Sequence, residues 1–102
     1  MMGNMKARSV LNQRIPTTEN NFFHVVIWQL PAPLPGCTHP YKYRLAYVVE
    51  DVCVVRFDNE RGRGDHWHYG ALVQPFVFRG LEQLLMDFHH AMKRWNNEHG
   101  ID

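Results

Sequence analysis

The chain has 102 residues, of which 45% are hydrophobic, 13% aromatic and 21% charged, and its formal net charge is +1 with seven histidines counted neutral. This length allows one domain and leaves too little chain for a second core. A charge this small excludes a protein that coats nucleic acid or membranes through its overall field, so any anion site must be local. We expect one domain over residues 1–102, in which residues 1–21 carry the weakest pattern.

No segment approaches the roughly 20 apolar residues that cross a bilayer, and the first residues lack the apolar stretch of a signal peptide. Cys37 and Cys53 do not have the spacing of a metal knuckle or of a redox C-x-x-C motif. Cys53 lies in an apolar run, which favours a reduced, buried thiol. The sequence therefore predicts a cytoplasmic protein without a disulfide.

Two segments near the N-terminus have the composition of a hairpin. Residues 23–30, FHVVIWQL, are rich in β-branched and aromatic residues and end at Pro31, as a buried strand would. Residues 7–15 are the candidate partner strand across the polar turn PTTENN. Residues 31–36 hold three prolines and predict a connection without regular ladder hydrogen bonds.

Residues 41–58 predict a second, tight hairpin with Glu50 and Asp51 at its turn. The alternation assigns the following residues to the apolar face: Tyr43, Leu45, Tyr47, Val49, Cys53, Val55 and Phe57. It assigns these to the polar face: Lys42, Arg44, Arg56 and Asp58. Two further strands are expected in the segments DHWHYG and PFVF.

From Gly80 the period changes to that of one amphipathic helix. Its apolar stripe comprises Leu81, Leu84, Leu85, Phe88, Ala91, Met92 and Trp95. Gly80 is the expected N-cap, with Gln83 at the capping-box position, and Gly100 is the expected stop. The predicted fold class is α+β: an antiparallel sheet of about four to six strands packed on one long C-terminal helix.

A His-x-His pair lies in the segment after the glycine-containing tip NERGRG. In an extended segment His66 and His68 project from one face, and Trp67 and Tyr69 from the other. The aromatic pair is the better candidate for the core. The histidines would then share the polar face of the sheet.

The register of the hairpin around this tip decides where the histidines lie. A symmetric hairpin would oppose Asp58 to Asp65 and turn the histidines to the apolar face. A shift of one residue, through a bulge that Gly62 or Gly64 permits, would place them among the cations instead. We expect the shifted register because it lets Trp67 join the core.

Two histidines, a carboxylate and arginines suit metal-independent RNA cleavage by general base and general acid. The catalytic candidates are His66, His68, Asp65 and Asp58. The substrate-binding candidates are Arg61, Arg63, Arg44, Lys42, Arg56 and Asn59. No cofactor and no metal are expected in this interpretation.

Three alternatives stay open. In the first, the tip NERGRG is a surface turn without a function, in which neighbouring acidic residues neutralise Arg61 and Arg63. A His-x-His with Asp58 or Asp65 could instead hold zinc in a hydrolase. A non-catalytic domain that binds protein or nucleic acid is the third, and exposed sheet edges also suggest a homodimer or partner capture.

Three stretches, WQLPAPLPGCTHPYKYRLAYV, FDNERGRGDHWHYG and PFVFRGLEQLLMDFHHAM, resemble the TumE-type toxin family of bacterial toxin-antitoxin pairs. The resemblance covers residues 23–95 and implies a type II toxin that inhibits growth through RNA or translation and is neutralised by a helix-turn-helix antitoxin. The chain departs from the family pattern at two positions. Tyr is expected at the position of Phe57, and a more polar residue is expected at the position of Trp67. The motif falls on Asp58, Asn59, Glu60, Arg61, Gly64, Asp65, His66 and His68.

Overall fold

The computed structural model describes residues 6–101 and has the predicted α+β architecture. All neighbouring strands are antiparallel and follow the chain order, so the sheet is a meander with β1 and β6 at its edges. The elements are β1 Arg8–Thr18, β2 Asn21–Gln29, β3 Tyr41–Val49, β4 Val52–Glu60, β5 Gly64–Tyr69, β6 Leu72–Pro75 and α1 Leu81–His99.

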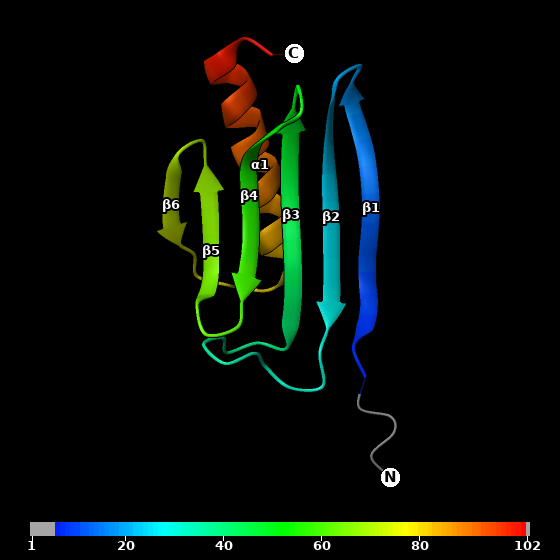
Figure 1. Ribbon diagram of the computed structural model, residues 1–102, viewed down its shortest axis with the longest axis vertical. Coiled ribbons are helices and arrows are strands. Elements are labelled where there is room, and N and C mark those ends of the chain that lie inside the picture. The colour runs from blue at the N-terminus through cyan, green and yellow to red at the C-terminus, as the bar shows by residue number, and fades with distance from the viewer. Residues whose placement is uncertain (1–5, 102) are drawn as a thin grey trace.

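The helix covers one side of the sheet only. Figure 1 shows α1 behind β3 and β4, while no helix crosses the side that faces the viewer. We call the uncovered side the open face and the other the helix side. The open face carries the alternate side chains His24, Val26, Trp28, Lys42, Arg44, Ala46, Arg56, Asp58, His66 and His68.

The core lies between α1 and the helix side. The predicted stripe is confirmed, since Leu84 and Phe88 are 0% and 2% exposed, and Ala91 and Met92 are also buried. They pack with buried residues of the central strands: Val25, Ile27, Tyr43, Leu45, Tyr47, Val55 and Phe57. The period-2 pattern of β3 thus separates core side chains from the cations of the open face.

The helix begins after Gly80 and ends before Gly100, as predicted, but the expected capping box is not formed. Gly100 adopts the left-handed conformation, with φ 67°, that lets a chain leave a helix. Gly80 is the N-cap, yet Gln83 does not complete a capping box. Its amide Nε2 donates to Asp87 Oδ1 at 2.9 Å, one turn further on.

The predicted N-terminal hairpin and the predicted hairpin over residues 41–58 are both confirmed. β1 pairs with β2 along nearly its whole length, and Glu50 and Asp51 close the β3–β4 hairpin with φ of 48° and 69°. Two successive positive φ angles belong to the type I′ turn, whose twist suits adjacent strands. Among residues 6–101, no helix is long and apolar enough to cross a membrane.

Two details of the predicted strands were wrong. The last strand is Leu72–Pro75 and not PFVF, because beyond Pro75 the chain leaves the sheet edge to reach α1. Cys53 is exposed, not buried. A bulge lets it pair with Val48 on the open face, so the simple alternation of β4 fails at its start.

Candidate functional site

The β4–β5 register places both histidines on the open face. Asp58 lies opposite His66, and Arg56 lies opposite His68. This is the shifted register, which is therefore confirmed. Trp67 lies on the helix side, where its ring stacks on Phe57 with centroids 5.5 Å apart.

A three-residue loop, not a bulge within the ladder, produces the shift. The amide of Arg63 donates to the Glu60 carbonyl at 3.1 Å, and Gly62 has φ of 80° at the third turn position, as a type II turn requires. Gly64 has φ of 75°, and a Cβ there would lie 3.0 Å from the carbonyl oxygen of Gly36. Both glycines are thus needed for the register that gathers the site.

We call Arg56, Asp58, His66 and His68 the open-face cluster. Three of these side chains contact one another. Arg56 Nη2 lies 2.9 Å from His68 Nε2, and its Nε lies 3.1 Å from Asp58 Oδ2. The second contact is an ion pair without hydrogen-bond geometry, which leaves the buried Nε without a hydrogen-bond partner. His68 Nε2 is also 3.8 Å from Asp58 Oδ1. One guanidinium therefore bridges the imidazole and the carboxylate.

The tautomer and the charge of the His68 ring follow from its contact with Arg56. A guanidinium can only donate, so His68 Nε2 accepts and the neutral ring carries its proton on Nδ1. Burial lowers the pKa of His68, and the positive charge of Arg56 lowers it further, against a smaller opposing effect of Asp58. The imidazole is accordingly neutral at neutral pH, as a general base must be.

Replacing Arg56 by glutamine is expected to raise the pKa of His68 towards its ordinary value. The substitution removes the charge that disfavours the imidazolium, while the burial of the ring persists. Titrating the His68 ring protons by NMR in both proteins measures this. An unchanged or lower pKa in the variant would contradict the assigned contact.

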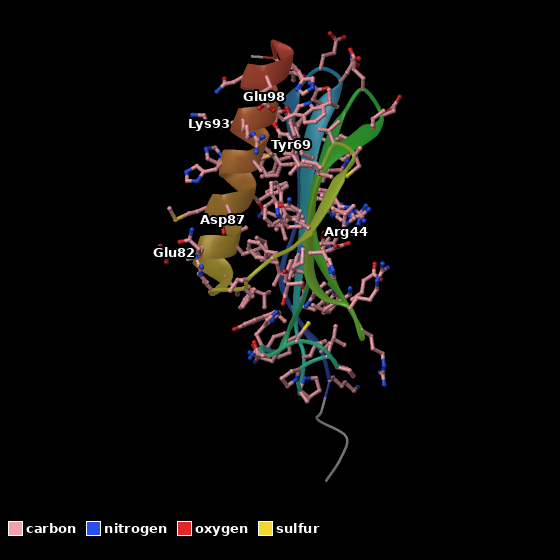
Figure 2. All side chains as sticks on the ribbon, turned by 90° about the vertical axis from the view of Figure 1, so that its left-hand side faces the viewer. Arg44, Tyr69, Glu82, Asp87, Lys93 and Glu98 are labelled. Atoms are coloured by element: carbon pink, nitrogen blue, oxygen red, sulfur yellow. The ribbon has the colours of Figure 1, made fainter. Side chains whose placement is uncertain are left out.

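His66 occupies the next position of the same face. Its Nδ1 lies 3.3 Å from the carbonyl oxygen of Gly64, so Nδ1–H donates and Nε2 is directed to other partners. A hollow of about 50 Å³ adjoins both rings, and its lining comprises Arg56, Asp58, Glu60, Arg63, His66, His68 and Val73. Arg44 lies opposite Asp58 and points away from the helix in Figure 2.

Asp65 and Asn59 lie on the other side of the sheet from the histidines. Asp65 Oδ1 accepts from the Tyr43 hydroxyl at 2.6 Å and contacts His39 Nε2 at 2.8 Å. Asn59 is 0% exposed and bonds the backbone of β3. Neither side chain can reach a substrate bound beside His66, so the structure separates both from that cluster.

The remaining predicted cations are dispersed. Arg61 is exposed at the loop tip, and Arg63 pairs with Glu60 at 3.4 Å. Lys42 Nζ donates to the carbonyl oxygen of Asn59. The tip is thus partly self-neutralised, while Arg44 and Arg56 lie on the face that carries the histidines.

A cluster of polar side chains on the helix side, Cys37, His39 and Asp65, was not predicted from the sequence. The ligand atoms of Cys37, His39 and Asp65 all lie within 4.8 Å of one another, as in a candidate metal site. However, His39 Nδ1 accepts the amide proton of Tyr41 at 3.2 Å, so Nε2 carries the ring proton and donates it to Asp65. Coordination by Nε2 would leave both ring nitrogens without a proton, which does not fit a neutral imidazole ligand.

This helix-side group instead fixes the connection between β2 and β3. His39 is 7% exposed and stacks on Phe78 with centroids 3.7 Å apart. The amide of Gly62 donates to the Pro35 carbonyl at 2.7 Å, so the connection also supports the β4–β5 loop. Its proline-rich sequence has no periodicity that could have placed His39 beside Asp65.

The comparisons with known proteins bear on this geometry. The sequence profile described as "Toxin TumE" matches residues 5–96, nearly the whole chain. The chain belongs to the TumE toxin family. It is thus a toxin, and membership implies an antitoxin partner. Comparison with curated proteins and with solved structures returned no match.

The two departures of this toxin from the expected family pattern both fall on the helix side. Phe57 is 3% exposed and lies in the core, with its ring edge-on to Phe76 at 5.1 Å. A hydroxyl at this position would point into the core and away from His66 and His68. Trp67 extends the same aromatic contact. The open-face cluster is therefore untouched by either substitution.

Proposed function

We propose that this toxin cleaves RNA at the open-face cluster without a metal ion. The observation that carries the proposal is the pairing of a neutral His68, bonded to Arg56, with a second histidine on the same face. A neutral imidazole beside a guanidinium provides a base and a phosphate ligand at one point. Asp58 holds Arg56 in place through its ion pair.

The reaction needs one proton removed and one supplied. His68 Nε2 takes the proton of a ribose 2′-hydroxyl, whose oxygen attacks the adjacent phosphorus. His66, protonated at Nε2, gives its proton to the departing 5′-oxygen as the bond from phosphorus to that oxygen breaks. The products are a 2′,3′-cyclic phosphate and a 5′-hydroxyl, and the two histidines have exchanged protonation states.

Arg56 links substrate binding to activation of the base. In the free toxin its Nη2 occupies the His68 lone pair at 2.9 Å. A phosphate offers the guanidinium a charged, bidentate partner, which draws Arg56 from the imidazole. Moving the cation away and bringing an anion near both favour the imidazolium. His68 thus becomes a stronger base when RNA is bound.

Incubating purified toxin with RNA, with and without a chelator, tests this proposal. We expect cleavage that persists in chelator and is lost in the His66→Ala, His68→Ala double variant, which controls for contaminating nuclease. Cleavage abolished by chelator would favour the zinc alternative. Retention of RNA without cleavage would favour a binding domain.

We propose further that the antitoxin is a helix-turn-helix protein of a type II pair. This rests on the sequence resemblance alone. The uncovered open face offers a surface on which a bound protein would block the histidines. Co-expression of the protein encoded beside this toxin should restore growth and co-purify with it, whereas neutralisation by an RNA would exclude the type II assignment.

A further inference from the structure

Trp28 is a large aromatic side chain on the open face that the core does not use. It is 38% exposed, and it lies opposite Lys42 on the neighbouring strand. The two other tryptophans pack on the helix side: Trp67 stacks on Phe57, and Trp95 stacks on His99. Among residues 6–101, Trp28 has no such aromatic partner.

Cations connect Trp28 with the histidines. Lys42 adjoins it on β3. Arg44 lies two residues further along β3, opposite Asp58 of β4, and two strand positions from His66 of β5. Arg44 is exposed and takes part in none of the ion pairs formed within residues 6–101. Lys42 donates one hydrogen bond to Asn59, and an ammonium has two more protons to give.

Two small apolar side chains border the cations on this surface. Val26 lies opposite Arg44, and Ala46, which is 2% exposed, follows on β3. β2 and β5 are three strand spacings apart, or about 14 Å. A ligand that touches both Trp28 and the histidines must therefore be extended and several units long.

We propose that Trp28 is a base-stacking subsite for single-stranded RNA, with Arg44 and Lys42 binding the phosphates between it and the histidines. The inference rests on the proposed function and identifies its substrate as a single strand. An aromatic ring next to cations on an open sheet face matches how single-stranded RNA is bound, because unpaired bases stack and the backbone needs positive charge. A duplex would keep its bases from the ring.

The part of the open face formed by β1 and the first half of β2 is less suited to bind RNA. The Arg14 guanidinium lies 3.9 Å from the centre of the Phe22 ring, and His24 Nε2 lies 2.9 Å from Asn12 Oδ1. These groups already satisfy one another. The RNA path therefore follows β3 towards Trp28.

An RNA that cannot be cleaved separates this inference from the reaction. The probe is a fluorescent 2′-O-methyl oligonucleotide of about eight nucleotides, within the site sizes of single-strand-binding folds. Its anisotropy gives the Kd. We expect Trp28→Ala to weaken binding about 5- to 150-fold, as loss of one stacked base does, and Trp28→Phe to recover most of this loss. Trp28→Leu, apolar but not aromatic, should not recover it.

The salt dependence supplies a matched control for the cations. Arg44→Ala should reduce the slope of log Kd against log salt by about one phosphate contact. Lys93→Ala removes the same charge from the exposed face of α1, on the other side of the sheet, and should leave the slope unchanged. Thermal unfolding of each variant verifies that it is folded.

Three results would overturn the inference. Equal Kd values for wild type and Trp28→Ala, with RNA cleavage intact in both, would remove the subsite and leave the proposed function standing. Loss of antitoxin binding in Trp28→Ala with unchanged RNA binding would assign the side chain to the protein partner. Absence of any binding or cleavage of RNA by the wild type would reject this inference and the proposed function together.

Discussion

Replacing His68 by alanine is expected to lower kcat/KM for RNA cleavage by about 10² to 10⁴-fold, the usual contribution of a positioned proton-transfer group. Growth arrest in cells without antitoxin should be relieved accordingly. His68 is partly exposed on the open face, so its loss leaves the core intact. The measurement is single-turnover cleavage of a defined RNA by the purified variant.

His24→Ala is the matched control for this substitution. His24 lies on the same face but is bonded to Asn12, two strands from β4. We expect its removal to change cleavage less than about threefold, since it makes no contact with the reacting groups proposed here. Full toxicity of His68→Ala and of His66→Ala would refute the catalytic assignment.

Asn59→Ala is expected to reduce the free energy of unfolding by about 2–4 kcal/mol. The Asn59 side chain accepts from the Tyr43 amide at 3.0 Å and donates to the Tyr41 carbonyl at 2.6 Å. It thereby continues the β3–β4 pairing beyond the last ladder pair. Alanine would leave both backbone groups unsatisfied at a fully buried position. Urea denaturation at constant m-value measures the loss.

Arg61→Ala is the comparison for Asn59→Ala. Arg61 is exposed at the tip of the adjoining loop, and its substitution should change stability by less than about 0.5 kcal/mol. If Asn59→Ala were as stable as the wild type and only its RNA affinity fell, Asn59 would return to the substrate-binding residues. Its complete burial argues for the structural role.

The alternation of the strands explains how much of the open-face cluster could be predicted. Period 2 puts His66 and His68 on one face, and the glycines of the loop allow the register that joins them to Arg56. The same rule puts Asp65 with Trp67 and Asn59 with Phe57, so their position on the helix side was already implied by the sequence. Asp65 and Asn59 were grouped with the histidines only because of their chemical type, a carboxylate and an amide.

The positions of Cys53, His39 and Trp28 could not be predicted from the local sequence pattern. The bulge that exposes Cys53 depends on how β4 pairs with β3, and a simple alternation cannot reveal one extra residue. His39 reaches Asp65 through a connection whose prolines remove any periodicity. The apolar composition of residues 23–30 does not reveal that Trp28 faces away from the core, and the one-sided covering by α1 leaves it exposed.

The two sheet edges differ in what they offer to a partner. β6 has four residues and ends at Pro75, whereas β1 has eleven, nearly all exposed. A long exposed edge strand is a natural site for pairing with another chain. The homodimer or partner capture that the sequence left open would most simply use this edge, and it would leave the open face uncovered.

The chemical ends of the cleaved RNA test the central claim most directly, namely that histidines of the open face activate a 2′-hydroxyl. Mass spectrometry of the fragments made in the presence of chelator should show a 2′,3′-cyclic phosphate on one fragment and a 5′-hydroxyl on the other. A single 2′-deoxy substitution at the cleaved nucleotide should prevent cleavage there. Fragments with a 3′-hydroxyl and a 5′-phosphate, or undiminished cleavage at the 2′-deoxy position, would contradict the account.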